Sequence, residues 1–187
     1  MNWWKHLRTI NAHKKIVRKL CFKLGLYKQG LLHDLSKYMP AEFLVGVKYY
    51  QGYRSPNNKE RETIGYSSAW LHHKGRNKHH YEYWVDYGLD GEKTLIEIEM
   101  PLKYAAEMFA DRIAASKNYE KENYTDESPL KYYKKGKGNK VMHEKTDKLL
   151  HGWLVMLSEQ GEEATLAHVK RLLKEEKKKK EKSCKIS

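Results

Sequence analysis

The sequence predicts an all-α fold, a single compact helical bundle, and three observations support this fold class. Apolar residues recur at steps of three and four along most of the 187 residues, as they do on the buried face of a helix. Strand patterns are scarce, and no internal repeat or linker divides a chain that is long enough to bury one core. We therefore expect one helical domain over residues 1–174 and a lysine-rich tail over residues 175–187.

The helices of the N-terminal half are expected from apolar periodicity and from the residues that begin or end helices. The first apolar stripe ends at Gly25, and Pro40 suits the first turn of a later helix. Gly75 can break a helix within the histidine-rich segment. The expected helices cover residues 3–24, a short stretch with Leu31, Leu32 and Leu35, and residues 41–52, 60–73 and 77–87, with a loop at residues 54–58.

The C-terminal half is expected to contain three helices and one long irregular segment. Met100-Pro101 opens a helix that reaches about residue 117, and two closing helices cover residues 146–157 and 162–174. Residues 118–146 are rich in Tyr, Lys, Gly and Asn with little periodicity, which is typical of an ordered flap or a surface loop.

The chain carries a net charge of +13, and this charge is uneven. Residues 170–187 hold nine Lys or Arg and three Glu, which indicates a solvated helix end or a disordered tail, with attraction to polyanions as the alternative. The sequence contains no run of 18 apolar residues and no secretory signal pattern, so we expect a cytoplasmic protein without a membrane partner. Nucleic acid stays open as a partner of the basic surface, and the sequence predicts no oligomeric state.

The most informative motif is the His33-Asp34 doublet. On a helix, adjacent side chains project about 100° apart, so one cation above the helix can contact both groups. Further candidate ligands occur before and after the doublet, and imidazoles combined with carboxylates favour zinc, iron, manganese, nickel or cobalt. We therefore expect one or two divalent transition metal ions. The candidate ligands are His13, His33, Asp34, His73, His79, His80 and Asp111.

Four histidines lie within residues 72–80, beside large aromatic residues. If this segment is one helix, seven residues make almost two turns, so His73 and His80 share a face and are the preferred ligands. If Gly75 breaks the helix, His79 can take the place of His80. An exposed polar surface is the alternative interpretation of the whole cluster.

The other candidates have structural alternatives. His13 lies on the apolar stripe of the first helix and is either a ligand or a buried core histidine. Asp111 lies among alanines that allow helices to approach closely, but it can also form a surface ion pair. Glu107, one turn earlier, is a ligand, a group that holds a histidine tautomer, or an exposed residue. Lys37 follows Asp34 by one turn and can bind a substrate phosphate or pair with that carboxylate.

The ordered set of His13, His33-Asp34 and Asp111 resembles the signature of the HD-domain superfamily of metal-dependent phosphohydrolases. The resemblance implies a divalent metal that is bound inside an all-α bundle of the HD-domain type.

The histidines between the doublet and the final aspartate, His73 and His79 or His80, resemble those of the two-metal branch of that superfamily. That branch usually spreads these ligands over separate helices, whereas here they lie within eight residues. The motifs His-Asp-Leu-Ser-Lys-Tyr and Glu-Met-Phe-Ala-Asp-Arg, within residues 5–160, are also similar to a family of small uncharacterised proteins from bacteria and their phages.

The resemblance implies a phosphohydrolase that acts on a phosphate ester or phosphodiester, with a phosphorylated small molecule, a nucleotide, as the expected substrate. Its catalytic residues would be Asp34, which steers a metal-activated water, and Lys37, which stabilises phosphate charge. Two alternatives stay open. One is a di-iron oxygenase of the HD type, and the other is a non-catalytic, metal-stabilised module that binds nucleic acid.

Overall fold

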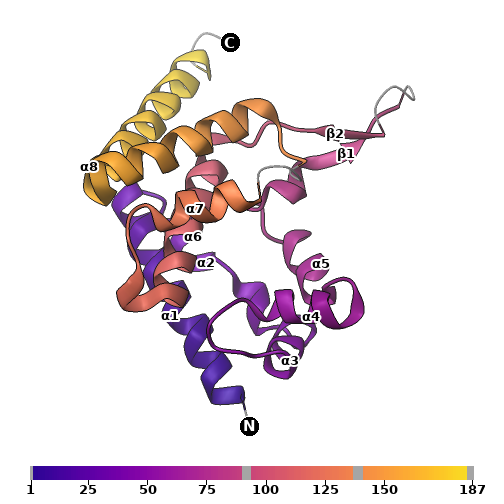
Figure 1. The fold of residues 1–187 in the computed structure, drawn as a ribbon. Helices are drawn as coiled ribbons and strands as arrows, with labels where there is room; N and C mark the ends of the chain where they lie inside the picture. The colour runs from indigo at the N-terminus through magenta and orange to yellow at the C-terminus, as the bar shows by residue number, and fades with distance from the viewer. Residues whose placement is uncertain (1, 90–93, 137–140, 185–187) are drawn as a thin grey trace.

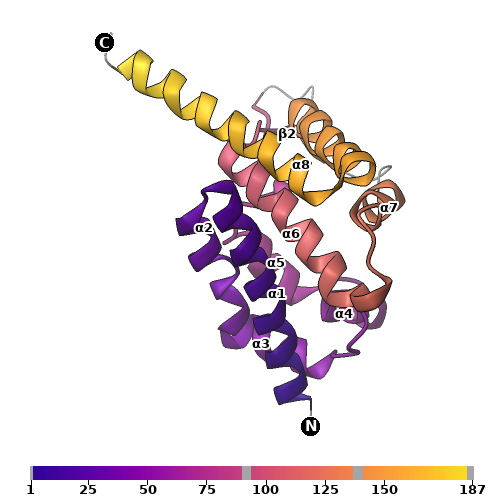
Figure 2. The same cartoon turned by 90° about the vertical axis from the view of Figure 1, so that its left-hand side faces the viewer.

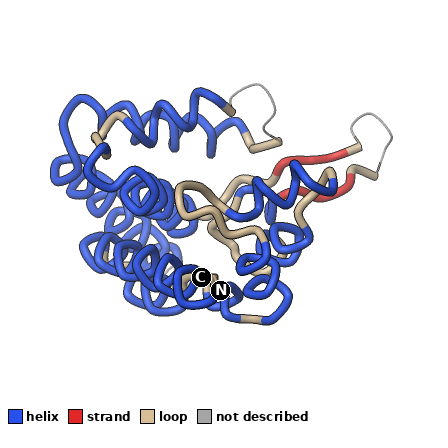
Figure 3. The backbone as a smooth tube through the Cα atoms, turned by 60° about the horizontal axis from the view of Figure 1, so that its bottom comes forward, coloured by secondary structure: helices blue, strands red, loops and turns tan. Residues whose placement is uncertain are grey.

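The computed structural model describes residues 2–89, 94–136 and 141–184, and within them the fold is all-α apart from one short hairpin (Figure 1; Figure 3). The predicted fold class is confirmed. The elements, with η for a 3-10 helix, are α1 (Trp3–Leu24), α2 (Tyr27–Leu32), η1 (Leu35–Tyr38), α3 (Pro40–Lys48), α4 (Pro56–Ile64), α5 (Ser68–Lys74), η2 (Tyr81–Trp84), β1 (Val85–Tyr87), β2 (Leu95–Glu97), α6 (Leu102–Glu120), η3 (Lys121–Asn123), α7 (Ser128–Lys135) and α8 (Glu144–Cys184).

Helices α1, α6 and α8 form the centre of the bundle (Figure 2). Four alanines of α6 have no exposed surface, and their small side chains allow the neighbouring helices to approach its backbone. Val17 of α1 and Leu154 of α8 are also fully buried in this core. The close packing brings the inward face of α1, which carries His13, next to the face of α6 that carries Asp111.

Much of the segment between α1 and α6 packs against α1 or against itself. Helix α2 packs against α1, and α3 packs against α5. His6 of α1 fills the space above Gly46 of α3, where an added Cβ would lie 2.1 Å from His6 Nε2. Glycine is therefore required at this crossing of α1 and α3.

Several predicted boundaries are wrong, and local backbone geometry explains them. The helix predicted over residues 60–73 is two helices, because Gly65 adopts a left-handed φ of 85° between α4 and α5. Helix α4 begins at Pro56, inside the predicted loop. The helix predicted over residues 77–87 is η2 followed by β1, which pairs antiparallel with β2.

The C-terminal region follows the predicted pattern more closely. The irregular segment predicted over residues 118–146 is wrong in part, because it contains the end of α6, η3, α7 and the start of α8; residues 137–140 lie outside the described residues. Helix α8 spans both predicted closing helices, and Gly161 (φ 82°, ψ 172°) interrupts its helical geometry between them. The end of α8 projects from the bundle as an exposed helix, as one of the two interpretations of the tail predicted, and residues 185–187 lie outside the described residues (Figure 2). Among the described helices, none has the length and apolar character to cross a membrane.

Candidate metal centre

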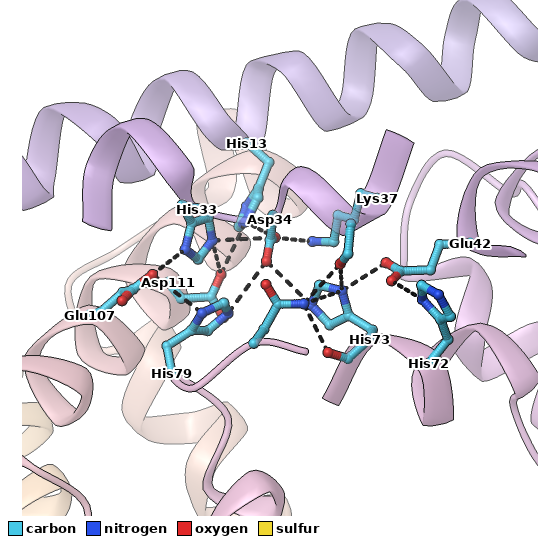
Figure 4. A network of polar contacts seen from close by, with 12 residues as sticks. His13, His33, Asp34, Lys37, Glu42, His72, His73, His79, Glu107 and Asp111 are labelled. Carbon is cyan, nitrogen blue, oxygen red and sulfur yellow. Dashed lines mark hydrogen bonds and ion pairs between the residues drawn. The ribbon is translucent and has the colours of Figure 1, made fainter. Parts of the chain in front are cut away.

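The His33-Asp34 doublet lies in a break between α2 and η1, so the prediction that both residues lie on one helix is wrong. His33 leaves helical geometry with φ −51° and ψ 129°, and Asp34 adopts a left-handed φ of 55°. A positive φ is uncommon outside glycine, although aspartate tolerates it, and it is enriched at functional sites. This turn directs both side chains into the same buried space (Figure 4).

The first group of candidate ligands consists of His13, His33, Asp34 and Asp111. His13 Nε2 lies 3.0 Å from Asp111 Oδ1 and 3.5 Å from Asp34 Oδ2. His33 Nε2 lies 3.2 Å from Asp34 Oδ2 and 3.3 Å from Asp111 Oδ1. One nitrogen or oxygen atom from each residue lies within 4.8 Å of the others, a spacing that ligands at about 2.0–2.2 Å from one shared ion can have.

The second group consists of Asp34, His73, His79 and His80, with the same mutual spacing. His73 Nε2 lies 3.2 Å from Asp34 Oδ1, and His79 Nε2 lies 3.4 Å from the same oxygen. Asp34 is therefore common to both groups, and it turns Oδ2 to the first group and Oδ1 to the second.

The three histidines of the second group do not share one helical face, so the argument that preferred His73 and His80 for that reason is wrong. Helix α5 ends at Lys74 with Gly75 as its C-cap, and His79 and His80 lie on the turns that follow. The alternative in which Gly75 breaks the helix is correct. Because the chain reverses within these eight residues, His73 and His79 both reach Asp34, and His80 stays close to them.

Within the described residues, several buried atoms that face this centre form no hydrogen bond, although oppositely charged groups lie close to some of them. An unsatisfied buried polar atom costs about 1–3 kcal/mol, so a cluster of them favours a ligand that satisfies all of them at once. Several nitrogen and carboxylate lone pairs around one space suit a divalent transition metal. The residues present therefore fit a metal. The atoms without a hydrogen bond are His13 Nε2, His33 Nε2, both Asp34 oxygens, His79 Nε2 and His80 Nε2, and of these Asp34 Oδ2 forms an ion pair with Lys37.

Glu107 of α6 holds one histidine of each group. His33 Nδ1 donates to Glu107 Oε1 at 2.9 Å, and His79 Nδ1 lies 3.3 Å from the same oxygen. A carboxylate that accepts from Nδ1 places the proton there and leaves the Nε2 lone pair free for a metal. Of the roles predicted for Glu107, the structure supports the one that orients histidines. His33, His79 and Glu107 also lie close enough together to hold an ion between them, and the Nδ1 contacts of the two rings with Glu107 account for this spacing.

Glu42 of α3 has the same relation to two other histidines, and the sequence analysis missed it. His73 Nδ1 donates to Glu42 at 2.7 Å, and His72 Nδ1 donates to its other oxygen at 2.6 Å. Asn77 donates to the backbone carbonyl of His73 at 2.8 Å, which fixes the turn after α5. The available signal was a single glutamate inside the apolar run Ala-Glu-Phe-Leu-Val.

The charges at the centre keep its carboxylates ionised. Burial would raise the pKa of Asp34, but without a metal the charges of protonated His33 and of Lys37 hold this pKa well below its usual value, and a bound ion would displace the proton from His33 Nε2. The pKa of Asp111 is also well below its usual value, because the neighbouring imidazoles of His13 and His33 outweigh the effect of burial. Burial and the neighbouring histidines hold the pKa of His80 well below its usual value, so this ring is neutral and available as a ligand.

Lys37 lies where the centre approaches solvent. Its Nζ is 2.5 Å from Asp34 Oδ2, so the ion pair, one of the two predicted interactions, is present. Burial opposes the charge of Lys37, but Asp34 and Asp111 raise its pKa, and the side chain is an ammonium. The side chains of Lys37 and Asp111 are 31% and 17% exposed, against 0% for His33 and 1% for Asp34. A small molecule would therefore approach from the side of Lys37 and Asp111.

All seven predicted metal ligands thus lie in the two groups, and their binding of a metal stays a prediction. The sequence model of DUF5662, described as a family of unknown function, matches residues 2–155. This match contains every residue of the centre. Neither a curated protein nor a solved structure matches the chain.

Proposed function

The chain belongs to DUF5662, a family of unknown function, and we propose that it is a metal-dependent phosphohydrolase with a two-metal centre of the HD-domain type. The observation that carries this proposal is the shared carboxylate of Asp34. Two groups of nitrogen and oxygen ligands meet at this one side chain, and each group faces a different oxygen. Two-metal sites of this kind are common in phosphatases and nucleases.

The residues of the chain have distinct tasks in this proposal. His13, His33 and Asp111 would hold one ion, His73, His79 and His80 would hold the other, and Asp34 would join them. Bound divalent ions supply Lewis acidity and lower the pKa of water. Glu107 and Glu42 keep the ring nitrogens directed inward, so that a substrate meets a site that needs little rearrangement.

Lys37 gives the centre its preference for a phosphorylated substrate. Its ammonium lies at the exposed edge and is held by Asp34 Oδ2. A phosphoryl oxygen that reaches the centre from this edge would meet a fixed positive charge, which stabilises the negative charge that develops during displacement. We propose a nucleotide or a similar small phosphate ester as the substrate.

The experiment uses protein without a histidine tag, loaded with manganese, iron, zinc, nickel or cobalt. Hydrolysis of p-nitrophenyl phosphate, bis-(p-nitrophenyl) phosphate and a panel of nucleotides is then measured together with metal content. We expect turnover with at least one metal. Asp34→Ala should lose both metal and turnover. Lys37→Ala should keep the metal but lower kcat/KM by about 100–1,000-fold.

Lys131→Ala is the matched control, because Lys131 is an exposed lysine of α7 that pairs with Glu127 and with none of the candidate ligands. It should behave as the unmodified protein. Metal binding without hydrolysis of any of these substrates would refute the proposed activity while leaving the metal centre intact. Equal metal loss in Lys37→Ala would show that this lysine only supports Asp34.

A further inference from the structure

The outward face of α1 is strongly basic. The first 33 residues contain eight Lys or Arg and neither Asp nor Glu, and seven of these cations lie on α1. The next two acidic residues, Asp34 and Glu42, are buried. The N-terminal quarter of the chain therefore contributes no exposed carboxylate of its own to offset this positive charge, although Lys23 pairs with Glu162 of α8.

Large apolar side chains are exposed in the same region. Trp4 is 73% exposed, and Trp3, Trp4, Leu7 and Phe43 line a hollow of about 600 Å³. Single exposed apolar residues are ordinary, but this many in one region indicate an interaction surface. The exposed apolar residues are Trp3, Trp4, Phe22, Tyr27, Leu31, Leu32, Leu35, Tyr38, Met39 and Leu44.

Side-chain contacts place these apolar residues beside the basic stripe along the length of α1. The ring of Phe22 lies 5.2 Å from that of Tyr27, Tyr38 donates to Asn11 at 2.6 Å, and the Trp3 ring lies 5.1 Å from a ring of α3. The segment from α2 through η1 to α3 therefore runs antiparallel to α1, with α2 beside its C-terminal half and α3 beside its N-terminal half (Figure 2).

We propose that this surface, α1 together with α2, η1 and α3, binds the surface of an anionic lipid membrane. Basic residues are attracted to anionic headgroups, tryptophan prefers the membrane interface, and exposed leucines gain by entering the acyl region. Nucleic acid would neutralise the cations but leave the leucines in water. A second copy of the chain would bring two positive faces together.

This proposal is independent of the proposed hydrolase activity, and it revises the expectation that the chain has no membrane partner. That expectation rested on the lack of a spanning segment, and peripheral binding requires none. His13 lies on the inward side of α1, so the membrane would contact the side of α1 opposite to this candidate ligand.

The test is sedimentation of the full, untagged chain with lipid vesicles. Vesicles of phosphatidylcholine with about one third phosphatidylserine should bind the protein, and vesicles of phosphatidylcholine alone should not. Arg8→Glu with Lys15→Glu, both exposed on α1, should weaken binding by roughly 25-fold or more, since each cation near such a surface contributes about fivefold. Trp4→Ala should weaken it by about tenfold.

The matched control is Lys178→Glu with Lys179→Glu, the same charge change at exposed positions of α8. It should retain binding, and all variants should keep the circular dichroism spectrum of the unmodified protein. Failure to bind the phosphatidylserine vesicles would overturn the proposal, as would an equal loss in the α8 control. Binding of a short DNA duplex instead of vesicles, with the same loss in the α1 variant, would assign the surface to nucleic acid and also overturn it.

Discussion

Glu107→Gln tests how the two groups of ligands are held in place. Glu107 accepts from His33 of the first group and lies 3.3 Å from His79 Nδ1 of the second. Loss of its negative charge frees both rings to reorient and lowers their basicity, and such supporting contacts typically contribute about 10–100-fold in metal affinity. We therefore expect both ions to bind about 10–100-fold more weakly, which corresponds to about 1.4–2.7 kcal/mol for each.

Glu42→Gln should separate the two ions, because Glu42 contacts only His73 among the candidate ligands. One binding step should weaken by about 10–100-fold and the other should stay unchanged. The assay is competition with a coloured chelator, in which untagged, metal-free protein is titrated and both steps are fitted. Glu62→Gln, an exposed glutamate paired with Arg54, is the control and should leave both steps unchanged.

Three outcomes would refute this reasoning. Unchanged affinity in both variants would show that the glutamates do not orient ligands. Equal weakening of both steps in Glu42→Gln would show that the groups are not held separately. Weakening in the Glu62→Gln control would show that the assay reports net charge rather than the contacts of Glu107 and Glu42.

The remaining predictions concern packing, pH and the tail. Gly46→Ala should lower the free energy of unfolding by about 1–3 kcal/mol, because the new Cβ would lie 2.1 Å from His6 Nε2. Gly152→Ala, in the open part of α8, should raise the free energy of unfolding by about 0.5–1 kcal/mol. Urea unfolding measures both variants, and a more stable Gly46→Ala variant would contradict the packing. Burial and the charge of Lys37 lower the pKa of His6 from 6.5 to about 4. As the pH falls from 6.5 to about 4, His6 therefore takes up a proton in the unfolded state but not in the folded state, and the free energy of unfolding decreases over this range. His6→Leu should therefore reduce the loss of unfolding free energy between about pH 7 and about pH 4.5 by roughly 1–2 kcal/mol, and an equal loss in both proteins would contradict this. Removal of residues 175–187 should leave metal content and turnover of small phosphate esters unchanged, and a truncated protein that keeps its metal but loses turnover would give the tail a role in catalysis.

The sequence allowed the helical class and the set of candidate ligands to be predicted, because both leave strong local signals. The apolar stripe of α1 ends at Gly25, which adopts the left-handed φ of 81° that its place after the helix requires. The His33-Asp34 doublet and the later histidines stand out by composition alone. The structure places them together, as the inward-facing pattern of α1 and α6 predicted.

The geometry around these residues could not be predicted, because it depends on backbone turns and on distant partners. A helical pattern surrounds Asp34, yet this residue has a φ of 55°, and nothing in the adjacent sequence distinguishes the two conformations. The choice between His79 and His80 depended on a break after α5 that the sequence left open. Glu42 contacts residues about 30 positions away, so its role is visible only after α3 and α5 have packed.

Anomalous X-ray diffraction from crystals of the untagged protein, grown with its bound metal, tests the two-metal centre most directly. We expect two peaks, one beside each oxygen of Asp34 and about 3.5–4 Å apart, one held by the first group of ligands and the other by the second. The absence of a peak at Asp34, or a single ion held by the first group while His73, His79 and His80 stay without metal, would contradict the proposed centre.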